Sequence, residues 1–384
     1  MNNQLMRERW NSVMQSNYGT PAISLARGSG AEVWDVEGKR YLDFLSGIAT
    51  NLLGHAHPAI VKAITAQAST LSHVSNFYSH EPGLALAEEL IRLIGHPGKV
   101  FFCNSGAEAN EAAFKLSRLT GKTHVVAAVN AFHGRTMGAL SLTGQPAKQD
   151  PFRPLPGDVQ HVPFGDVAAL EAAVTAQTAM IILEPIQGEA GVITAPSGYL
   201  AAARAIADKC GALLVFDEVQ TGMGRTGLWF AHQHEGVLPD VITMAKGIGA
   251  GLPLGAMIAL GSAAELFTGG AHGSTFGGNP ICCAAGLAAI KVIEGDHLMD
   301  NVKARSEEIT GELKNHHAVS EVRGKGLLLG VRLKTANSSD VQQRLLEAGF
   351  LTNAAQVDTI RLAPPLIVSA DQVAEFTTAF KELA

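Results

Sequence analysis

Val241-Ile242-Thr243-Met244-Ala245-Lys246 is a short apolar run that ends in a lysine, and the flexible stretch Gly247-Ile248-Gly249-Ala250-Gly251 follows it directly. A lysine at the exit of such a run is unusual, because lysine is rarely buried without a task. Upstream, Leu213-Leu214-Val215-Phe216-Asp217-Glu218 is a second apolar run, and this one ends in acid. If the two runs form neighbouring parallel strands, we expect Asp217 and Lys246 to face the same crevice.

A lysine and an acid at the ends of two such strands suit one cofactor well, pyridoxal 5'-phosphate. Its aldehyde forms a Schiff base with a lysine, and its ring nitrogen pairs with an aspartate. Taken alone, Lys246 can equally be read as an ordinary surface lysine after a strand, so the rest of the chain has to decide.

The composition is typical of a well-packed globular protein, because 47% of the 384 residues are hydrophobic and 17% are charged. The length is enough for two domains. The net charge of −6 provides no basic surface for nucleic acid, so we expect no nucleic-acid partner. The N-terminus has no apolar signal-peptide core, and no run of about eighteen apolar residues occurs, so we also expect no membrane span.

Cysteine and histidine usage argues against disulfides and metals. Cys103, Cys210, Cys282 and Cys283 show no CxxC spacing, which predicts reduced thiols of a cytoplasmic protein. The 14 histidines are scattered without partners at metal-ligand spacing, so we expect no metal site.

Short β-rich runs alternate with alanine-rich helical stretches, which predicts an α/β domain with a mostly parallel sheet. The strands are near-continuous apolar runs, as expected when helices cover both faces of the sheet. We expect strands at residues 100–103, 124–129, 180–183, 212–216, 241–244 and 256–260, and helices at residues 84–94, 107–119 and 200–209.

The pattern changes after about residue 280, where a long helix over residues 280–294 leads to strand-like residues 324–333 and 359–362. This indicates a smaller α+β domain. Near the N-terminus, residues 31–44 predict a hairpin that turns at Glu37-Gly38. We therefore expect three segments: residues 1–50 join the small domain, 51–280 form the large domain, and 281–384 form the C-terminal small domain.

The segment Asn104-Ser105-Gly106-Ala107-Glu108-Ala109-Asn110 follows a strand and opens a helix. Ser105 is a good N-cap residue, and Gly106 lets a ligand approach the backbone. Because the free N–H groups and the positive end of a helix attract anions, this segment is a candidate phosphate site, although an ordinary capped helix would look the same. The expected buried face of the helix consists of Ala109, Ala112, Ala113, Leu116 and Leu119.

A second glycine-rich string, Gly222-Met223-Gly224-Arg225-Thr226-Gly227, matches the GxGxxG pattern of dinucleotide-binding proteins. That fingerprint requires strand, glycine turn and helix in immediate succession. Here several polar residues separate the strand from the glycines, and no convincing crossover helix follows. We therefore reject the nicotinamide interpretation.

Several motifs, taken together and in order, resemble the class III aminotransferases, which are fold-type I pyridoxal-phosphate enzymes. The resemblance spans most of the chain. The motifs are Ser105-Gly106-Ala107-Glu108-Ala109, Phe132-His133-Gly134-Arg135, Glu184-Pro185-Ile186-Gln187-Gly188-Glu189, Phe216-Asp217-Glu218-Val219-Gln220-Thr221-Gly222, Ala245-Lys246-Gly247 and Gly273-Ser274-Thr275-Phe276-Gly277-Gly278-Asn279-Pro280.

The resemblance implies a role for each matched residue around the cofactor. Lys246 is expected to be the Schiff-base lysine and proton shuttle, and Asp217 to pair with the pyridine nitrogen. Gln220 is expected to reach the ring hydroxyl and Phe132 to stack on the ring. Ser105, Gly106 and Ala107 are expected to bind the phosphate. The resemblance also implies a homodimer with a shared active site, in which Thr275 of the other subunit contacts the same phosphate.

The resemblance also implies a substrate site. Arg361, in the small domain, is expected to bind a carboxylate, and Glu189 to act as a switch that pairs with Arg361 when no α-carboxylate is there. Arg135 can hold a second carboxylate through a bidentate fork. Ser274, Ile48 and Tyr18 are further expected substrate contacts.

The implied activity is transfer of the amine of N2-acetylornithine to 2-oxoglutarate, which yields N-acetylglutamate 5-semialdehyde and glutamate in arginine biosynthesis. Class III enzymes that act on ornithine carry a tyrosine where Ile48 stands, and that tyrosine helps to hold the free α-amino group. Ile48 offers no hydrogen bond, so an acylated amine fits better. Succinyl-diaminopimelate, ornithine and 4-aminobutyrate remain alternative donors, and a pyridoxal-phosphate aminomutase is a further alternative.

Overall fold

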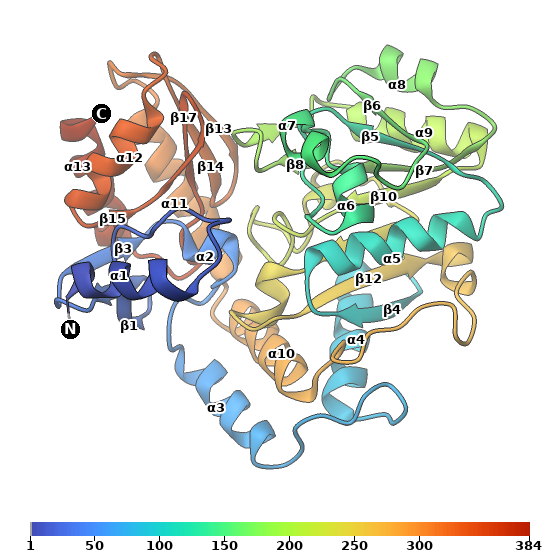
Figure 1. The fold of residues 1–384 in the computed structure, drawn as a ribbon, viewed down its shortest axis with the longest axis horizontal. Coiled ribbons are helices and arrows are strands. Elements are labelled where there is room, and N and C mark those ends of the chain that lie inside the picture. The colour runs from blue at the N-terminus through green and yellow to red at the C-terminus, as the bar shows by residue number, and fades with distance from the viewer. Residues whose placement is uncertain (1) are drawn as a thin grey trace.

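The computed structural model describes residues 2–384, which form a large α/β unit and a smaller unit beside it (Figure 1). A seven-stranded sheet forms the centre of the large unit, and its strand order is β4-β12-β11-β10-β7-β5-β6. Its strands are β4 (Gly98–Cys103), β5 (His124–Ala128), β6 (Val159–Val162), β7 (Thr178–Leu183), β10 (Leu213–Asp217), β11 (Val241–Met244) and β12 (Gly255–Leu260).

The sheet is mostly parallel, as the sequence predicts. Only β12 runs against its neighbours, because it pairs antiparallel with both β11 and β4. The six expected strands are all present, with ends within about two residues of those expected. The short edge strand β6, which pairs with β5, was not among the predicted strands.

Alternating side chains of the same strands pack on opposite faces of the sheet. Val126 and Ile181 pack with helices α8 (Val167–Ala173) and α9 (Tyr199–Cys210), whereas Val125 and Met180 pack with α5 (Gly106–Arg118). Period-two alternation explains this division, and burial on both faces explains why the strands read as unbroken apolar runs. The prediction that Leu119 belongs to the buried face of α5 is wrong. Leu119 is 48% exposed, because α5 ends at Arg118 and Leu119 is its C-cap residue.

The smaller unit combines residues from both ends of the chain. Strand β3 (Arg40–Asp43) pairs antiparallel with β2 (Glu32–Asp35) in the expected hairpin and parallel with β15 (Phe350–Leu351). An antiparallel sheet has the order β13-β14-β17-β16. The remaining elements here are β1 (Leu25–Ser29), β13 (Val319–Lys325), β14 (Leu328–Leu333), β16 (Asn353–Gln356), β17 (Thr359–Leu362), α1 (Asn3–Val13), α11 (Leu298–Leu313), α12 (Ser338–Glu347) and α13 (Ala370–Leu383).

Helix α10 (Pro280–Gly295) runs between the two units and packs on α3 (Pro58–Ala68) and α4 (Glu81–Ile94). The expected boundary at residues 280/281 falls at the first turn of this helix, and the division into three segments stays a prediction. The shorter elements are α2 (Ser46–Ala49), α6 (Met137–Leu142), α7 (Pro146–Gln149), β8 (Ile186–Gln187) and β9 (Ile193–Thr194).

The glycine-rich string at residues 222–227 does not form a dinucleotide-binding turn. Residues 222–227 form successive turns, and the next element is a short 3-10 segment, η2 (Ala231–His234), so the GxGxxG string lacks the crossover helix of a dinucleotide site. All four cysteines are unpaired, as expected, and Cys103 and Cys283 are buried. Within residues 2–384, no helix is both long enough and apolar enough to cross a membrane.

Candidate active site

A cavity of about 480 Å³ lies at the carboxyl ends of strands β10 and β11, a size typical of cofactor and substrate sites. Asp217 ends β10, Lys246 follows β11, and both side chains line the cavity. Because adjacent parallel strands end at the same edge of a sheet, this meeting follows from the topology. The cavity is lined by Thr50, Asn104, Ser105, Gly106, Ala107, Asn110, Phe132, His133, Gly134, Arg135, Glu184, Glu189, Asp217, Val219, Gln220, Ala245, Lys246, Gly251, Leu252, Pro253 and Leu254.

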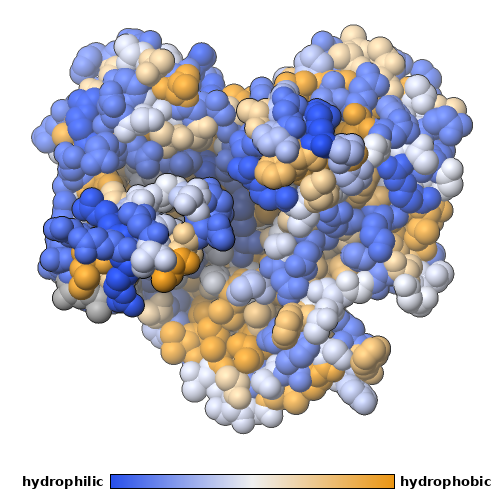
Figure 2. Space-filling view, in the orientation of Figure 1, coloured by the Kyte–Doolittle hydropathy of each residue, from blue (hydrophilic) through white to orange (hydrophobic). Residues whose placement is uncertain are grey.

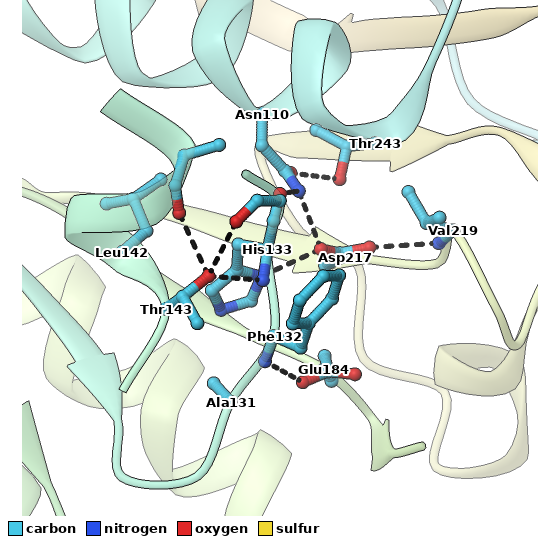
Figure 3. Close-up of polar contacts among 12 residues, drawn as sticks. Asn110, Ala131, Phe132, His133, Leu142, Thr143, Glu184, Asp217, Val219 and Thr243 are labelled. Atoms are coloured by element: carbon cyan, nitrogen blue, oxygen red, sulfur yellow. Dashed lines mark hydrogen bonds and ion pairs between the residues drawn. The ribbon is translucent and has the colours of Figure 1, made fainter. Parts of the chain in front are cut away.

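Three donors fix the carboxylate of Asp217 (Figure 3). His133 Nδ1 lies 2.7 Å and Asn110 Nδ2 lies 2.8 Å from Asp217 Oδ2, and the backbone N–H of Val219 donates to Oδ1 at 3.0 Å. Thr243 Oγ1 in turn donates to Asn110 Oδ1 at 2.7 Å. All four side chains are buried, so these bonds are strong and hold the carboxylate in one orientation.

The negative charge of Asp217 affects the pKa values of the ionisable groups around it. Burial lowers the pKa of His133, but the hydrogen bond and the negative charge of Asp217 outweigh burial, and the pKa of His133 is raised overall. Glu184, which accepts the backbone N–H of Phe132 at 2.9 Å, has its pKa raised to about 7, first by burial. The negative charges of Asp217 and Glu184 thus both favour the charged form of His133.

Lys246 has no hydrogen-bond partner for its amine among residues 2–384, and it lies in a left-handed backbone conformation with φ of 49°. Burial lowers the pKa of Lys246 to about 8, and the positive charge of Arg361 lowers it further, against the acids Glu189, Asp217 and Glu184. An amine with this pKa is partly neutral near pH 7, as a nucleophile or a general base requires.

The N-terminus of α5 forms another wall of the cavity. Ser105 caps it by accepting the backbone N–H of Glu108 at 3.2 Å, so its hydroxyl proton stays available to a ligand. Gly106 packs against Val219, and a Cβ at this position would lie 2.8 Å from Val219 Cγ1. Because the first N–H groups of a helix are free, Ser105, Gly106 and Ala107 form an anion cradle of the kind a phosphate needs.

Arg361 does not line the cavity itself but is hydrogen-bonded to Glu189 and Gln220, which do. It projects from β17, is only 2% exposed, and its Nη1 donates to Glu189 Oε1 at 2.5 Å and to Gln220 Oε1 at 3.3 Å. Burial raises the pKa of Glu189, but the charge and hydrogen bond of Arg361 outweigh this, so the pKa of Glu189 is lowered overall. A buried guanidinium paired with a carboxylate is therefore present at the cavity wall.

The expected residues do not all line this cavity. Ser274 contacts it indirectly, because Asn104 Nδ2 donates to Ser274 Oγ at 3.0 Å. Thr275 is exposed and lies outside the lining of its own chain's cavity, as do Ile48, which is 42% exposed, and Tyr18, which is 73% exposed. Arg135 lines the cavity, with its guanidinium carbon 5.5 Å from the centre of the Phe132 ring.

Three further residues lie at the cavity without a role predicted from the sequence. His133 and Asn110 bond Asp217, and Glu184 lines the cavity; each comes from a different segment of the chain. The available signal was that His133 and Glu184 lie in the loops that follow strands β5 and β7, and that Asn110 lies near the start of α5.

The sequence model of the "Aminotransferase class-III" family matches residues 13–383. The chain belongs to this family. It is also similar over nearly its whole length to an acetylornithine aminotransferase from Mycobacterium tuberculosis, to which it is 60% identical over 378 residues, 97% of this chain and 94% of the relative.

Solved structures of aminotransferases share the fold. An N-acetylornithine aminotransferase from Stenotrophomonas maltophilia is 35% identical and covers 96% of this chain and 97% of its own, with a TM-score of 0.84. An ornithine aminotransferase from Toxoplasma gondii is 30% identical, covers 99% of this chain and 94% of its own, and has a TM-score of 0.94. The Toxoplasma structure is described with partial occupancy of pyridoxal phosphate at its active site.

Class III aminotransferases depend on pyridoxal phosphate. The residues of this cavity fit that group: an amine with no hydrogen-bond partner among residues 2–384, a fixed buried carboxylate, and a helix N-terminus at which any residue larger than glycine at position 106 would strike Val219. The cavity thus offers one matching group for each reactive part of the cofactor.

Proposed function

We propose that this class III aminotransferase transfers the amine of N2-acetylornithine to 2-oxoglutarate and binds pyridoxal phosphate in the cavity between Asp217 and Lys246. The observation that carries the transamination is the arrangement of Lys246, Asp217 and Glu189 around one cavity, with Arg361 paired to Glu189. The choice of acetylornithine is supported by the name of the Mycobacterium tuberculosis relative at 60% identity.

When bound, pyridoxal phosphate supplies a carbonyl group and an electron-withdrawing ring that makes a substrate C–H bond acidic. Lys246 provides the amine that holds the cofactor and later moves a proton at the substrate carbon. Its pKa of about 8 suits both tasks near neutral pH. Asp217 stabilises a positive charge on the ring nitrogen, and His133 and Asn110 keep its carboxylate oriented.

Arg361 and Glu189 provide the means to accept two kinds of substrate at one site. An α-carboxylate, such as that of glutamate, can replace Glu189 on the guanidinium, whereas Glu189 neutralises Arg361 when the reacting end carries no carboxylate. This alternation is needed by an enzyme that binds a donor and an acceptor in turn. It disfavours an aminomutase, which moves an amine within one molecule.

We also propose a homodimer in which Thr275 contacts the phosphate bound by the partner subunit, because Thr275 is exposed and does not line its own cavity. A cytoplasmic location is part of the same proposal and is supported by the four unpaired cysteines.

Steady-state assays with acetylornithine, succinyl-diaminopimelate, ornithine and 4-aminobutyrate test the donor. We expect acetylornithine to have the highest kcat/KM and Lys246→Ala to lower the rate by more than about a thousandfold, since a positioned acid–base group alone contributes 10²–10⁴. If another donor had a higher kcat/KM than acetylornithine, that donor would be the preferred substrate and this part of the proposal would be wrong. A Lys246→Ala enzyme that keeps its rate would remove the proposed role of this lysine.

Ile48→Tyr tests the basis of donor choice. Ile48 offers no hydrogen bond to the free ammonium of ornithine, so we expect ornithine to be a poorer donor than acetylornithine in the unmodified enzyme. A tyrosine hydroxyl restores a partner and should narrow the ratio of the two kcat/KM values. If the ratio stays the same, Ile48 does not select the donor.

A further inference from the structure

Arg361 has a third partner besides Glu189 and Gln220. Its Nη2 donates to Asn353 Oδ1 at 2.8 Å, while its Nε has no hydrogen-bond partner among residues 2–384. The two strong contacts therefore act on different nitrogens, with Glu189 on Nη1 and Asn353 on Nη2. The Gln220 contact, at 3.3 Å, is long for a charged hydrogen bond.

The two strong partners come from different parts of the fold. Asn353 belongs to β16, which pairs antiparallel with β17, and its Cα lies directly opposite that of Arg361 in the register. Glu189 belongs to the β8–β9 hairpin of the large unit, and its side chain is 29% exposed. Directly paired residues in a sheet keep a fixed separation, so Asn353 stays beside Arg361 however Glu189 moves.

The chemistry of the two acceptors also differs. Glu189 is an anion and competes with a substrate carboxylate for the guanidinium, so it has to leave when the substrate binds. The amide of Asn353 is neutral, does not repel a carboxylate, and occupies only one of the two N–H groups on Nη2. A carboxylate can therefore bind while the bond to Asn353 persists.

We propose that Asn353 is a positioning residue that keeps the guanidinium of Arg361 oriented toward the cavity when Glu189 has moved away. Arg361 has several rotatable bonds, and after Glu189 leaves, the hydrogen bonds that remain on its guanidinium among residues 2–384 are those to Asn353 and, at a longer distance, to Gln220. A guanidinium that is held in place binds a carboxylate without first losing side-chain freedom. This inference rests on the proposed carboxylate-binding role of Arg361.

Asn353→Ala in two backgrounds tests the inference. In the otherwise unmodified enzyme, Glu189 still holds Arg361 at rest, and we expect KM for glutamate and 2-oxoglutarate to rise about two- to threefold. In the Glu189→Ala background we expect about a tenfold rise, the size of one lost hydrogen bond to a charged group, with kcat nearly unchanged in both. Equal effects in the two backgrounds would overturn the inference, because a purely structural residue would act equally.

Asn353→Asp provides a second test that preserves the side-chain shape. A carboxylate fixed opposite Arg361 competes with substrate whether or not Glu189 is present, so KM for both acids should rise more than about tenfold in either background. An unchanged KM would show that position 353 does not act on the guanidinium and would overturn the inference.

Two controls separate the possible causes. Asn301→Ala removes an amide that donates to the carbonyls of Leu366 and Val368, and it should lower thermal stability without raising KM. Arg361→Ala should raise KM for both acids. If it does not, the proposed role of Arg361 fails; if it does and the Asn353 variants leave KM unchanged, only the role of Asn353 fails.

Discussion

Three hydrogen bonds converge on the carboxylate of Asp217, and Asp217→Asn tests what this carboxylate does. An amide keeps the shape but cannot balance a positive ring nitrogen, so we expect the single-turnover reaction with glutamate to slow by about 10²–10³, as for other preorganised electrostatic contacts. Cofactor binding, followed by absorbance, should persist through the phosphate cradle. An unchanged rate would remove Asp217 from this role.

The same substitution has a consequence that is visible without cofactor. Asp217 raises the pKa of His133 through a hydrogen bond and its negative charge. Asp217→Asn should therefore lower the pKa of His133, which NMR titration of the cofactor-free protein can measure. A His133 pKa that does not fall would contradict the close pairing of the two side chains.

Lys246 should react as a neutral amine at unusually low pH. Its pKa of about 8 predicts that its acetylation by acetic anhydride, in the cofactor-free protein, rises with pH and levels off above about pH 8. The acetylation of the exposed Lys62, measured in the same reaction, serves as the internal reference for the reactivity of the reagent at each pH. Because the charge of Arg361 lowers the pKa of Lys246, Arg361→Ala should move this profile to higher pH. A midpoint near pH 10 in the unmodified protein would contradict the burial argument.

Among the elements near the cavity, the turn α2 has an unusual backbone conformation. Ser46, Gly47, Ile48 and Ala49 have φ values of 52°, 62°, 64° and 62°, so four successive residues are left-handed and three of them carry side chains. Asp43 Oδ1 accepts the N–H groups of Leu45 and Ser46 and holds the start of the turn. Left-handed geometry is costly for residues with a Cβ, especially a branched one such as Ile48.

The strain in this turn predicts that glycine stabilises the protein more than alanine does at position 48, the reverse of their order inside a helix. Ile48→Gly should unfold at higher denaturant concentration than Ile48→Ala, with a difference of about 1 kcal/mol, because only glycine adopts this φ without strain. Ala374→Gly, at an exposed position inside α13, should instead destabilise by about 1 kcal/mol. If the Ile48→Ala protein were more stable than the Ile48→Gly protein, the left-handed backbone at position 48 would not be strained.

At the scale of the whole molecule, large apolar side chains remain exposed on one face. Phe77 is 91%, Tyr78 is 73% and Phe276 is 60% exposed. Their two loops are joined, because Asn76 Nδ2 donates to the carbonyl of Gly277 at 3.1 Å. Figure 2 also shows orange residues gathered at its lower edge, where Figure 1 draws α3 and α10. Exposed apolar groups of this size indicate an interaction surface, as the proposed homodimer requires.

Phe276→Glu should therefore disrupt the dimer. A charge at an apolar interface leaves a desolvated carboxylate without a partner, so we expect monomers in analytical ultracentrifugation and a large loss of transaminase activity, because Thr275 would no longer reach the partner's site. Val357→Glu is the matched control, since Val357 is 72% exposed but lies outside the two loops of Phe77, Tyr78 and Phe276. A Phe276→Glu protein that stays dimeric would exclude this surface as the interface.

The sequence by itself was enough for the features that depend on neighbouring residues. The unbroken apolar runs predicted the central strands, and the small residues after β4 predicted the start of α5. Asp217 and Lys246 could be placed in one crevice because each ends a strand of a parallel pair. These predictions succeed because periodicity, capping and strand ends are local properties of the chain.

Only the tertiary structure decided which distant residues meet. No local pattern pairs His133 and Asn110 with Asp217, sets Asn353 opposite Arg361, or reverses β12 between two strands. The left-handed turn at Ile48 is likewise invisible in the sequence, because isoleucine disfavours it and contacts from Asp43 impose it. The physical reason is that such contacts depend on which faces of the sheets and helices are buried together, and that choice is made by the whole chain.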